Sequence, residues 1–113
     1  MLMSFRVAPN VEFIIEDAED EWIGAPYDYI HIRTLMGAIK DWPRLLTNAF
    51  NHLNPGGRIK ICDFEPVLKS NNGRMDQLSD VVKWTDGLHE AAAKFGRRMD
   101  VATHMHEWVH NAG

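Results

Sequence analysis

The sequence has 113 residues and a formal net charge of −4, with 45% hydrophobic and 25% charged residues. This length fits a single domain, and the composition is typical of a globular protein. The negative charge and the scattered Lys and Arg disfavour nucleic acid and anionic membranes as partners, and no apolar run reaches the roughly 18 residues that a membrane span requires. Cys62 is the only cysteine, so the chain has no internal disulfide. We therefore expect an intracellular protein, either cytoplasmic or nuclear.

The first third of the chain predicts two strands. Residues 11–15, VEFII, are rich in β-forming side chains and follow Pro9-Asn10, which favours a strand. The acidic residues 16–22 come next, and we interpret them as a short helix. The breakers Gly24 and Pro26 follow. Residues 27–32, YDYIHI, are apolar or aromatic on both faces, as in a buried parallel strand.

The middle of the chain predicts a helix followed by a strand. Asp41 is a suitable N-cap, and Pro43 suits a first helical turn because its missing N–H costs little there. Apolar residues then recur at helical spacing from Trp42 to Leu53. The sequence Asn-Pro-Gly-Gly at 54–57 ends this helix, with the glycines allowing the chain to turn into a third strand near residues 59–64.

The last third of the chain predicts two helices. Apolar side chains from Met75 to Phe95 indicate a long helix that ends near Gly96 and bends at Gly87. A final helix carries its apolar side chains on one face between Ala102 and Ala112. Strands that alternate with helices predict a mostly parallel sheet with helices on its faces.

Residues 106–110 read HEWVH, which matches the H-E-x-x-H pattern of zinc metalloproteases. On a helix, His106 and His110 share one face, as a pair of zinc ligands must. A catalytic zinc needs a third protein ligand, but only Asn, Ala and Gly follow at 111–113, and His104 points away from the pair. We therefore interpret the stretch as an amphipathic helix with solvated histidines and expect no metal. A zinc hydrolase is the third and least favoured hypothesis.

The central stretches "VEFIIEDAEDEW" and "YDYIHIRTLMGAIKDWPRLLTNAFNHLNPGGRIKICDF" resemble class I S-adenosylmethionine-dependent methyltransferases. The resemblance is closest to the fungal secondary-metabolism group that includes the velvet-complex regulator, and it covers residues 9–66 best. It implies an α/β, partial Rossmann-like methyltransferase fold, with about three parallel strands, helices on their faces and a helical C-terminal part. We expect one domain over residues 1–113, with a core in 1–66 and a mainly helical part in 67–113.

The resemblance also implies a cofactor, S-adenosylmethionine, and three residues that contact it. Asp17 and Ala18 follow the first predicted strand, where the family contacts adenine through a carboxylate and a backbone N–H. Arg33 follows the second strand, where the family's chain passes the methionine part of the cofactor. The alternatives are a helix-capping role for Asp17 and a surface ion pair for Arg33.

The chain also departs from the family pattern. No glycine precedes Gly24, so the family's glycine-rich cofactor loop is not among these residues, and neither are its C-terminal antiparallel strands. No residue is placed as a general base, although methyl transfer can proceed by proximity alone. We therefore expect a methyltransferase-like chain with weak or no activity, acting on a small-molecule or protein acceptor. The alternative is a non-catalytic module that binds a protein partner or itself.

Overall fold

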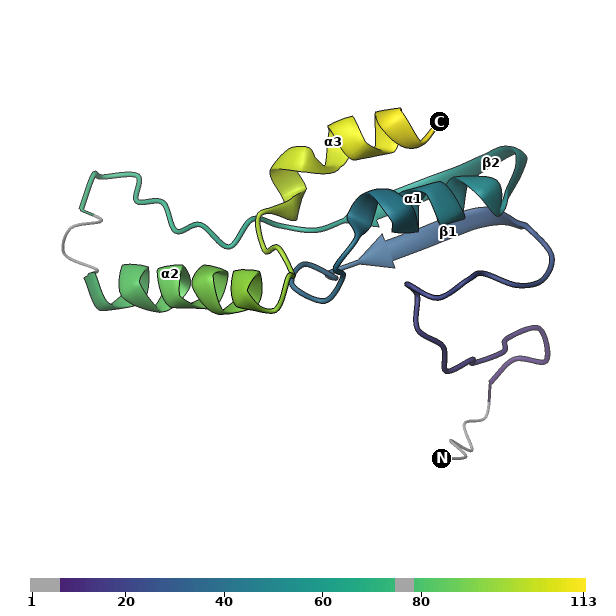
Figure 1. Ribbon diagram of the computed structural model, residues 1–113, viewed down its shortest axis with the longest axis horizontal. Helices are drawn as coiled ribbons and strands as arrows, with labels where there is room; N and C mark the ends of the chain where they lie inside the picture. Colours follow the sequence, from purple (N-terminus) through teal and green to yellow (C-terminus); the bar gives the residue numbers. More distant parts are fainter. Residues whose placement is uncertain (1–6, 75–78) are drawn as a thin grey trace.

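The computed structural model describes residues 7–74 and 79–113 of the chain. The elements follow the order strand, helix, strand, helix, helix (Figure 1). They are β1 (Tyr27–Arg33), α1 (Trp42–Asn51), β2 (Leu53–Cys62), α2 (Ser79–Lys94) and α3 (Val101–Ala112).

The two strands form a parallel sheet that α1 connects as a crossover. Ile30 pairs with Ile59 and Ile32 with Ile61, so these four side chains point to the same face of the sheet. A parallel pair needs a crossover of about a dozen residues or more, which the segment containing α1 supplies. The predicted α/β class with parallel strands and covering helices is therefore confirmed.

The predicted strand at residues 11–15 is wrong, so the sheet has two strands in the described residues and not three. This segment has no regular secondary structure, and its Ile14 and Ile15 side chains are 61% and 87% exposed. β-branched side chains favour a strand only where a neighbouring strand supplies hydrogen bonds and packing. In residues 7–74 and 79–113, no strand pairs with this segment. The short helix expected at residues 16–22 is also absent, and a turn at Ala18 and Glu19 stands in its place.

Helix α1 follows its prediction closely. The Asp41 carboxylate accepts a hydrogen bond from the Arg44 N–H at 3.0 Å, and Pro43 lies in the first turn. The helix buries Trp42, Leu45, Leu46 and Ala49. This spacing places them on one face, which packs against the sheet.

Strand β2 begins earlier than predicted, because the Asn-Pro-Gly-Gly stretch forms its first part. The register with β1 shifts between Tyr27 and Tyr29, which marks an irregularity in the ladder. A Cβ on Gly57 would lie 2.8 Å from the Asn54 carbonyl oxygen, and Gly56 has a φ of +81°. These two glycines therefore allow an irregular strand start rather than a turn before the strand.

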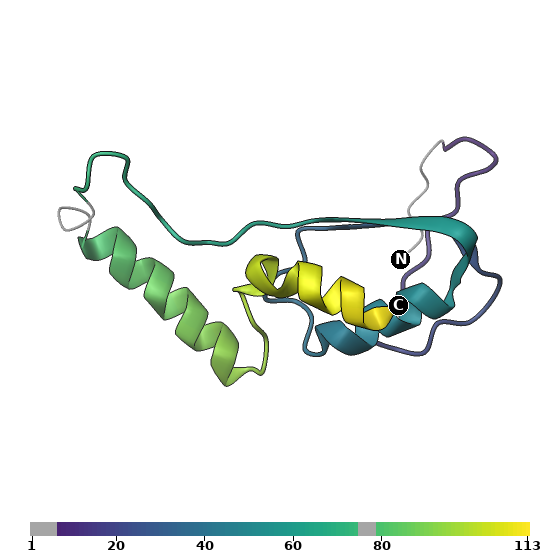
Figure 2. The same cartoon turned by 90° about the horizontal axis from the view of Figure 1, so that it is seen from above.

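Helices α1 and α3 both lie on one face of the sheet (Figure 2). Trp42 is 2% exposed, and its ring stacks on that of Trp108 with centroids 6.5 Å apart. Val101, at the start of α3, is fully buried. The core therefore lies between this face and the two helices, and the opposite face carries no helix of the described residues.

Helix α2 confirms the predicted long helix for residues 79–94, while Met75 and Leu78 of that prediction lie outside the described residues. The helix runs through Gly87 and extends away from the sheet as an arm (Figures 1 and 2). The radius of gyration is 17.8 Å, whereas a compact domain of this length would have about 13 Å. No helix of the described chain is long and apolar enough to cross a membrane.

Candidate functional site

The candidate site begins at the acidic turn that follows residues 11–15. The Asp17 Oδ1 atom accepts a hydrogen bond from the Glu19 N–H at 2.9 Å. Glu19 Oε1 in turn accepts from the N–H groups of Lys40 and Asp41, at 2.8 and 2.9 Å. These two donors directly precede α1, where N–H groups lack partners within the helix. The turn is therefore held against the beginning of α1, and Ala18 beside it is half-buried.

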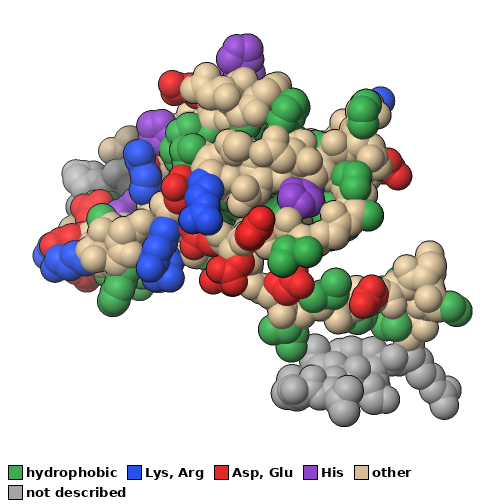
Figure 3. All heavy atoms as spheres, turned by 45° about the vertical axis from the view of Figure 1, so that its right-hand side comes forward, with side chains coloured by type: hydrophobic (Ala, Val, Ile, Leu, Met, Phe, Trp, Pro, Cys, Tyr) green, Lys and Arg blue, Asp and Glu red, His purple; other side chains and the backbone are tan. Residues whose placement is uncertain are grey.

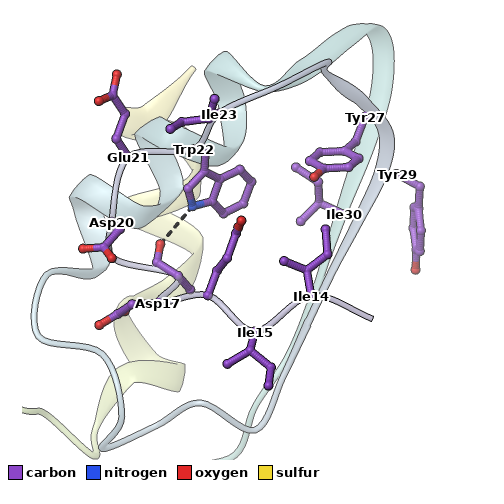
Figure 4. Close-up of a pocket in the computed structure, with 12 residues that line it drawn as sticks. Ile14, Ile15, Asp17, Asp20, Glu21, Trp22, Ile23, Tyr27, Tyr29 and Ile30 are labelled. Carbon is purple, nitrogen blue, oxygen red and sulfur yellow. Dashed lines mark hydrogen bonds between the residues drawn. The ribbon is translucent and has the colours of Figure 1, made fainter. Parts of the chain in front are cut away.

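A hollow of about 700 Å³ lies beside this turn (Figure 4). The Trp22 Nε1–H donates to the Ala18 carbonyl at 2.9 Å and so ties the ring to the turn. The carboxylates of Asp17, Asp20 and Glu21 point outward from the turn and away from the centre of the hollow. The lining of the hollow is mixed, with polar atoms beside the aromatic rings of Trp22, Tyr27 and Tyr29. The lining comes from two parts of the chain. The N-terminal segment contributes residues 14–18 and 20–23, and β1 contributes Tyr27, Tyr29 and Ile30.

The carboxyl ends of the two strands are joined by a side chain that the sequence analysis missed. The Asp63 Oδ2 atom accepts from the N–H groups of Leu35 and Met36, at 3.0 and 2.9 Å. This carboxylate therefore fixes the loop that leaves β1, at the edge where ligands bind in open parallel sheets. The predicted strand near residues 59–64 includes Asp63, whereas β2 ends at Cys62 and Asp63 directly follows it.

The structure brings two of the three predicted cofactor residues together. Asp17 and Ala18 both line the hollow, whereas Arg33 lies at the carboxyl end of β1 and is not part of that lining. Asp17 closes a turn and does not cap a helix, because no helix follows it. The exposed Arg33 forms no ion pair within residues 7–74 and 79–113, so the surface-pair alternative has no partner there.

A second polar cluster fixes the start of α3. Arg98 donates to both carboxylate oxygens of Asp100, at 2.8 and 2.6 Å, and contacts His104 Nε2 at 2.9 Å. The hydrogen bonds from Arg98 lower the pKa of Asp100 to about 2. Arg98 also lies over the Trp108 ring, with its Cζ 5.9 Å from the ring centroid. The Arg98–Asp100 pair therefore stays ionised near neutral pH and anchors α3, and no substrate role follows from it.

The HEWVH stretch lies on α3, where His106 and His110 are exposed. Among the described residues, no three His, Cys, Asp or Glu side chains lie close enough to hold a metal ion. Protein purified without added metal should therefore contain far less than one zinc per chain by elemental analysis. A stoichiometric zinc that disappears in His110→Ala but persists in His104→Ala would contradict this prediction.

Comparison with known protein families decides the class of the chain. A family model described as "Methyltransferase domain" matches residues 4–113, which is nearly the whole sequence. The chain belongs to this methyltransferase family. The resemblance found in the sequence is thereby confirmed.

Several fungal proteins are similar to this methyltransferase domain. "Methyltransferase pytC" of Aspergillus terreus is 41% identical over 105 residues, which cover 92% of this chain and 32% of pytC. "Methyltransferase cpsF" of Aspergillus campestris is 31% identical over 114 residues, which cover 98% of this chain and 40% of cpsF. "Secondary metabolism regulator laeA" of Coprinopsis cinerea is 30% identical over 90 residues, which cover 74% of this chain and 22% of laeA.

The methyltransferase domain described here thus spans about a third of the length of the curated relatives it matches. No solved structure gives a significant match to it. The relatives are fungal methyltransferases and secondary-metabolism regulators, and the predicted fungal secondary-metabolism group fits them.

Proposed function

We propose that this methyltransferase domain provides part of an S-adenosylmethionine site, with Asp17 and Ala18 as the contacts to adenine. The Asp17 Oδ2 atom and the Ala18 N–H have no hydrogen-bond partner in the described chain. The free oxygen can accept from the adenine amino group, and the N–H can donate to a ring nitrogen. This adjacent acceptor and donor, beside a hollow lined by aromatic side chains, is the observation that carries the proposal.

Arg33 completes the proposed site as a contact to the amino-acid part of the cofactor. Its exposed guanidinium lies at the carboxyl end of a parallel strand, the edge at which open α/β sheets bind ligands. Guanidinium groups bind carboxylates through paired hydrogen bonds. When bound, S-adenosylmethionine supplies an activated methyl group. The residues proposed here hold and orient the cofactor, and catalysis would rest on that positioning.

We further propose that the 113-residue chain by itself binds the cofactor weakly and transfers methyl groups slowly or not at all. Only these three residues are assigned to the cofactor, and no glycine-rich loop of the family's kind precedes Gly24 in the 113 residues. The acceptor is a small molecule or a protein, and fungal secondary metabolism is the setting, because the similar proteins carry the names "Methyltransferase pytC" and "Secondary metabolism regulator laeA".

The role of Arg33 can be tested with two ligands that differ in the amino-acid part. Arg33→Ala should weaken binding of S-adenosylmethionine about three- to fivefold, the effect of an exposed ion pair. Binding of 5′-methylthioadenosine, which lacks the carboxylate, should not change. Amide chemical shifts would measure both titrations, with Arg44→Ala, an exposed arginine on α1, as the matched control. Equal weakening for both ligands, or none for either, would contradict the assignment.

A second proposed function is self-association or binding of a protein partner, without catalysis. Ile14, Ile15 and Ile23 are 61%, 87% and 87% exposed, and the outer edge of β1 pairs with no strand of the described residues. Unpaired strand edges and exposed apolar side chains favour contact with another chain. Light scattering at micromolar concentration would detect a dimer or a larger assembly.

A further inference from the structure

The sheet face opposite α1 and α3 is polar and carries positive charge. Because side chains alternate along a strand, Tyr29, His31 and Arg33 of β1 point away from Ile30 and Ile32, which are buried under the helices. On β2, the exposed residues Arg58 and Lys60 alternate in the same way with Ile59 and Ile61. The register places Arg58 beside Tyr29, and Lys60 beside His31. We call this set of five residues the basic face: Tyr29, His31, Arg33, Arg58 and Lys60.

The charges of the basic face are not neutralised within the described chain. None of Arg33, Arg58 and Lys60 forms an ion pair in residues 7–74 and 79–113. Neighbouring strands lie about 4.8 Å apart, and alternate residues of a strand about 6.8 Å apart. Three unpaired cations therefore lie within roughly two such spacings, in a chain whose net charge is −4. This local cluster of positive charge favours binding of an anionic partner.

The same chain carries a segment of complementary charge. Residues 16–21 read EDAEDE, with five carboxylates in six positions. The carboxylates of Glu16, Asp20 and Glu21 are exposed and form no hydrogen bond or ion pair in the part of the chain that the structure describes. Figure 3 shows acidic side chains interspersed with hydrophobic ones along the N-terminal segment. The exposed Ile14, Ile15 and Ile23 flank the carboxylates, so a partner that covered them would also bury apolar surface.

We propose that the basic face binds the acidic segment, residues 16–21, of a second copy of this chain. Each copy carries both surfaces, so the contact is reciprocal and closes as a symmetric dimer with two such interfaces. The turn at residues 17–20 of the acidic segment leaves the carboxylates of Glu16, Asp20 and Glu21 exposed, and these can face the cations of the basic face. The proposal assigns a surface to the self-association proposed above. Arg33 and residues 17 and 18 belong both to this contact and to the proposed cofactor site, so the charge reversals that test the contact are made at other positions.

Salt dependence separates this contact from pairing of apolar strand edges. Attraction between exposed charges is screened by salt, because the Debye length falls from about 10 Å at 0.1 M to about 3 Å at 1 M. Contacts between apolar surfaces are not weakened in this way. The dimer should therefore dissociate as salt is raised, with a dissociation constant that increases about tenfold or more.

Charge reversal tests the proposed contact directly. The Arg58→Glu/Lys60→Glu variant should dimerise more weakly than the unsubstituted chain. Sedimentation velocity should give it a dissociation constant at least about tenfold higher. Asp20→Lys/Glu21→Lys should weaken the dimer similarly. The chain with all four substitutions should regain the dimer, because opposite charges again face each other. Lys69→Glu/Lys83→Glu is the matched control: it changes the net charge equally at exposed positions away from the sheet, and should keep the dimer.

Several results would overturn the proposal. One is a monomer at all concentrations and low salt. Another is a dimer that persists in both charge-reversal variants, or that becomes more stable as salt is raised. The chain would then still self-associate, but through an apolar strand edge. Failure of the four-substitution chain to regain the dimer, while its circular dichroism stays native, would also contradict the contact. So would binding of a nucleic acid duplex by the basic face without any dimer.

Discussion

Replacing Trp42 with alanine should lower the free energy of unfolding by about 3 to 5 kcal/mol. The side chain is 2% exposed and sits in the cluster that joins the sheet, α1 and α3. Its ring also stacks on Trp108, with a centroid distance of 6.5 Å, so truncation removes an aromatic contact and leaves a large cavity. Domains of this size have about 5 to 15 kcal/mol of stability in total. The variant should therefore lose a substantial part of the stability of the domain.

Urea unfolding followed by far-ultraviolet circular dichroism would measure this loss. Trp84→Ala is the matched control, because Trp84 is 65% exposed on α2 and its removal should change stability by less than about 0.5 kcal/mol. Trp42→Phe is also informative, because the buried Trp42 Nε1–H has no hydrogen-bond partner in the described chain. Phenylalanine removes that unpaired donor, so it should cost much less than alanine. Equal losses for Trp42→Ala and Trp84→Ala would contradict the described core.

Local sequence signals were sufficient for α1, α3 and the core of the sheet. Asp41, Pro43 and the spacing of apolar residues determine where α1 begins and which face it buries. Such signals act over one or two turns and hold wherever the helix packs. Residues 27–32 likewise predicted β1, but the expectation that both faces of this strand are buried was wrong. Only Ile30 and Ile32 are buried in the core, whereas Tyr27 and Tyr29 are 50% and 55% exposed.

Features that depend on distant residues could not be predicted. Residues 11–15 have the composition of a strand, but a strand forms only when another strand lies alongside. The contacts of Asp63 to Leu35 and Met36 join residues 27 and 28 positions apart. Hydrophobic periodicity describes only neighbouring residues, so it does not indicate a contact between residues this far apart in the sequence. Asp17 and Arg33 were selected through family resemblance, and their roles stay predictions.

Binding of S-adenosylmethionine should be weak for the 113-residue chain, which is the second large effect we expect. Each good hydrogen bond contributes on the order of 1 kcal/mol, and about 1.4 kcal/mol corresponds to a factor of ten in affinity. The resemblance implies a site in which a glycine-rich loop adds further backbone contacts. Losing two or three of these should shift the dissociation constant from roughly micromolar toward roughly millimolar.

The central claim is that Asp17, Ala18 and Arg33 provide part of a cofactor site. Titration of S-adenosylmethionine into the isotope-labelled chain, followed by backbone amide chemical shifts, tests it most directly. We predict saturable shifts with a dissociation constant near 1 mM, largest at the amides of Asp17, Ala18 and Glu19 and at the carboxyl end of β1. Shifts confined to α2, or no saturable shift at 10 mM ligand, would contradict the claim that these residues hold the cofactor.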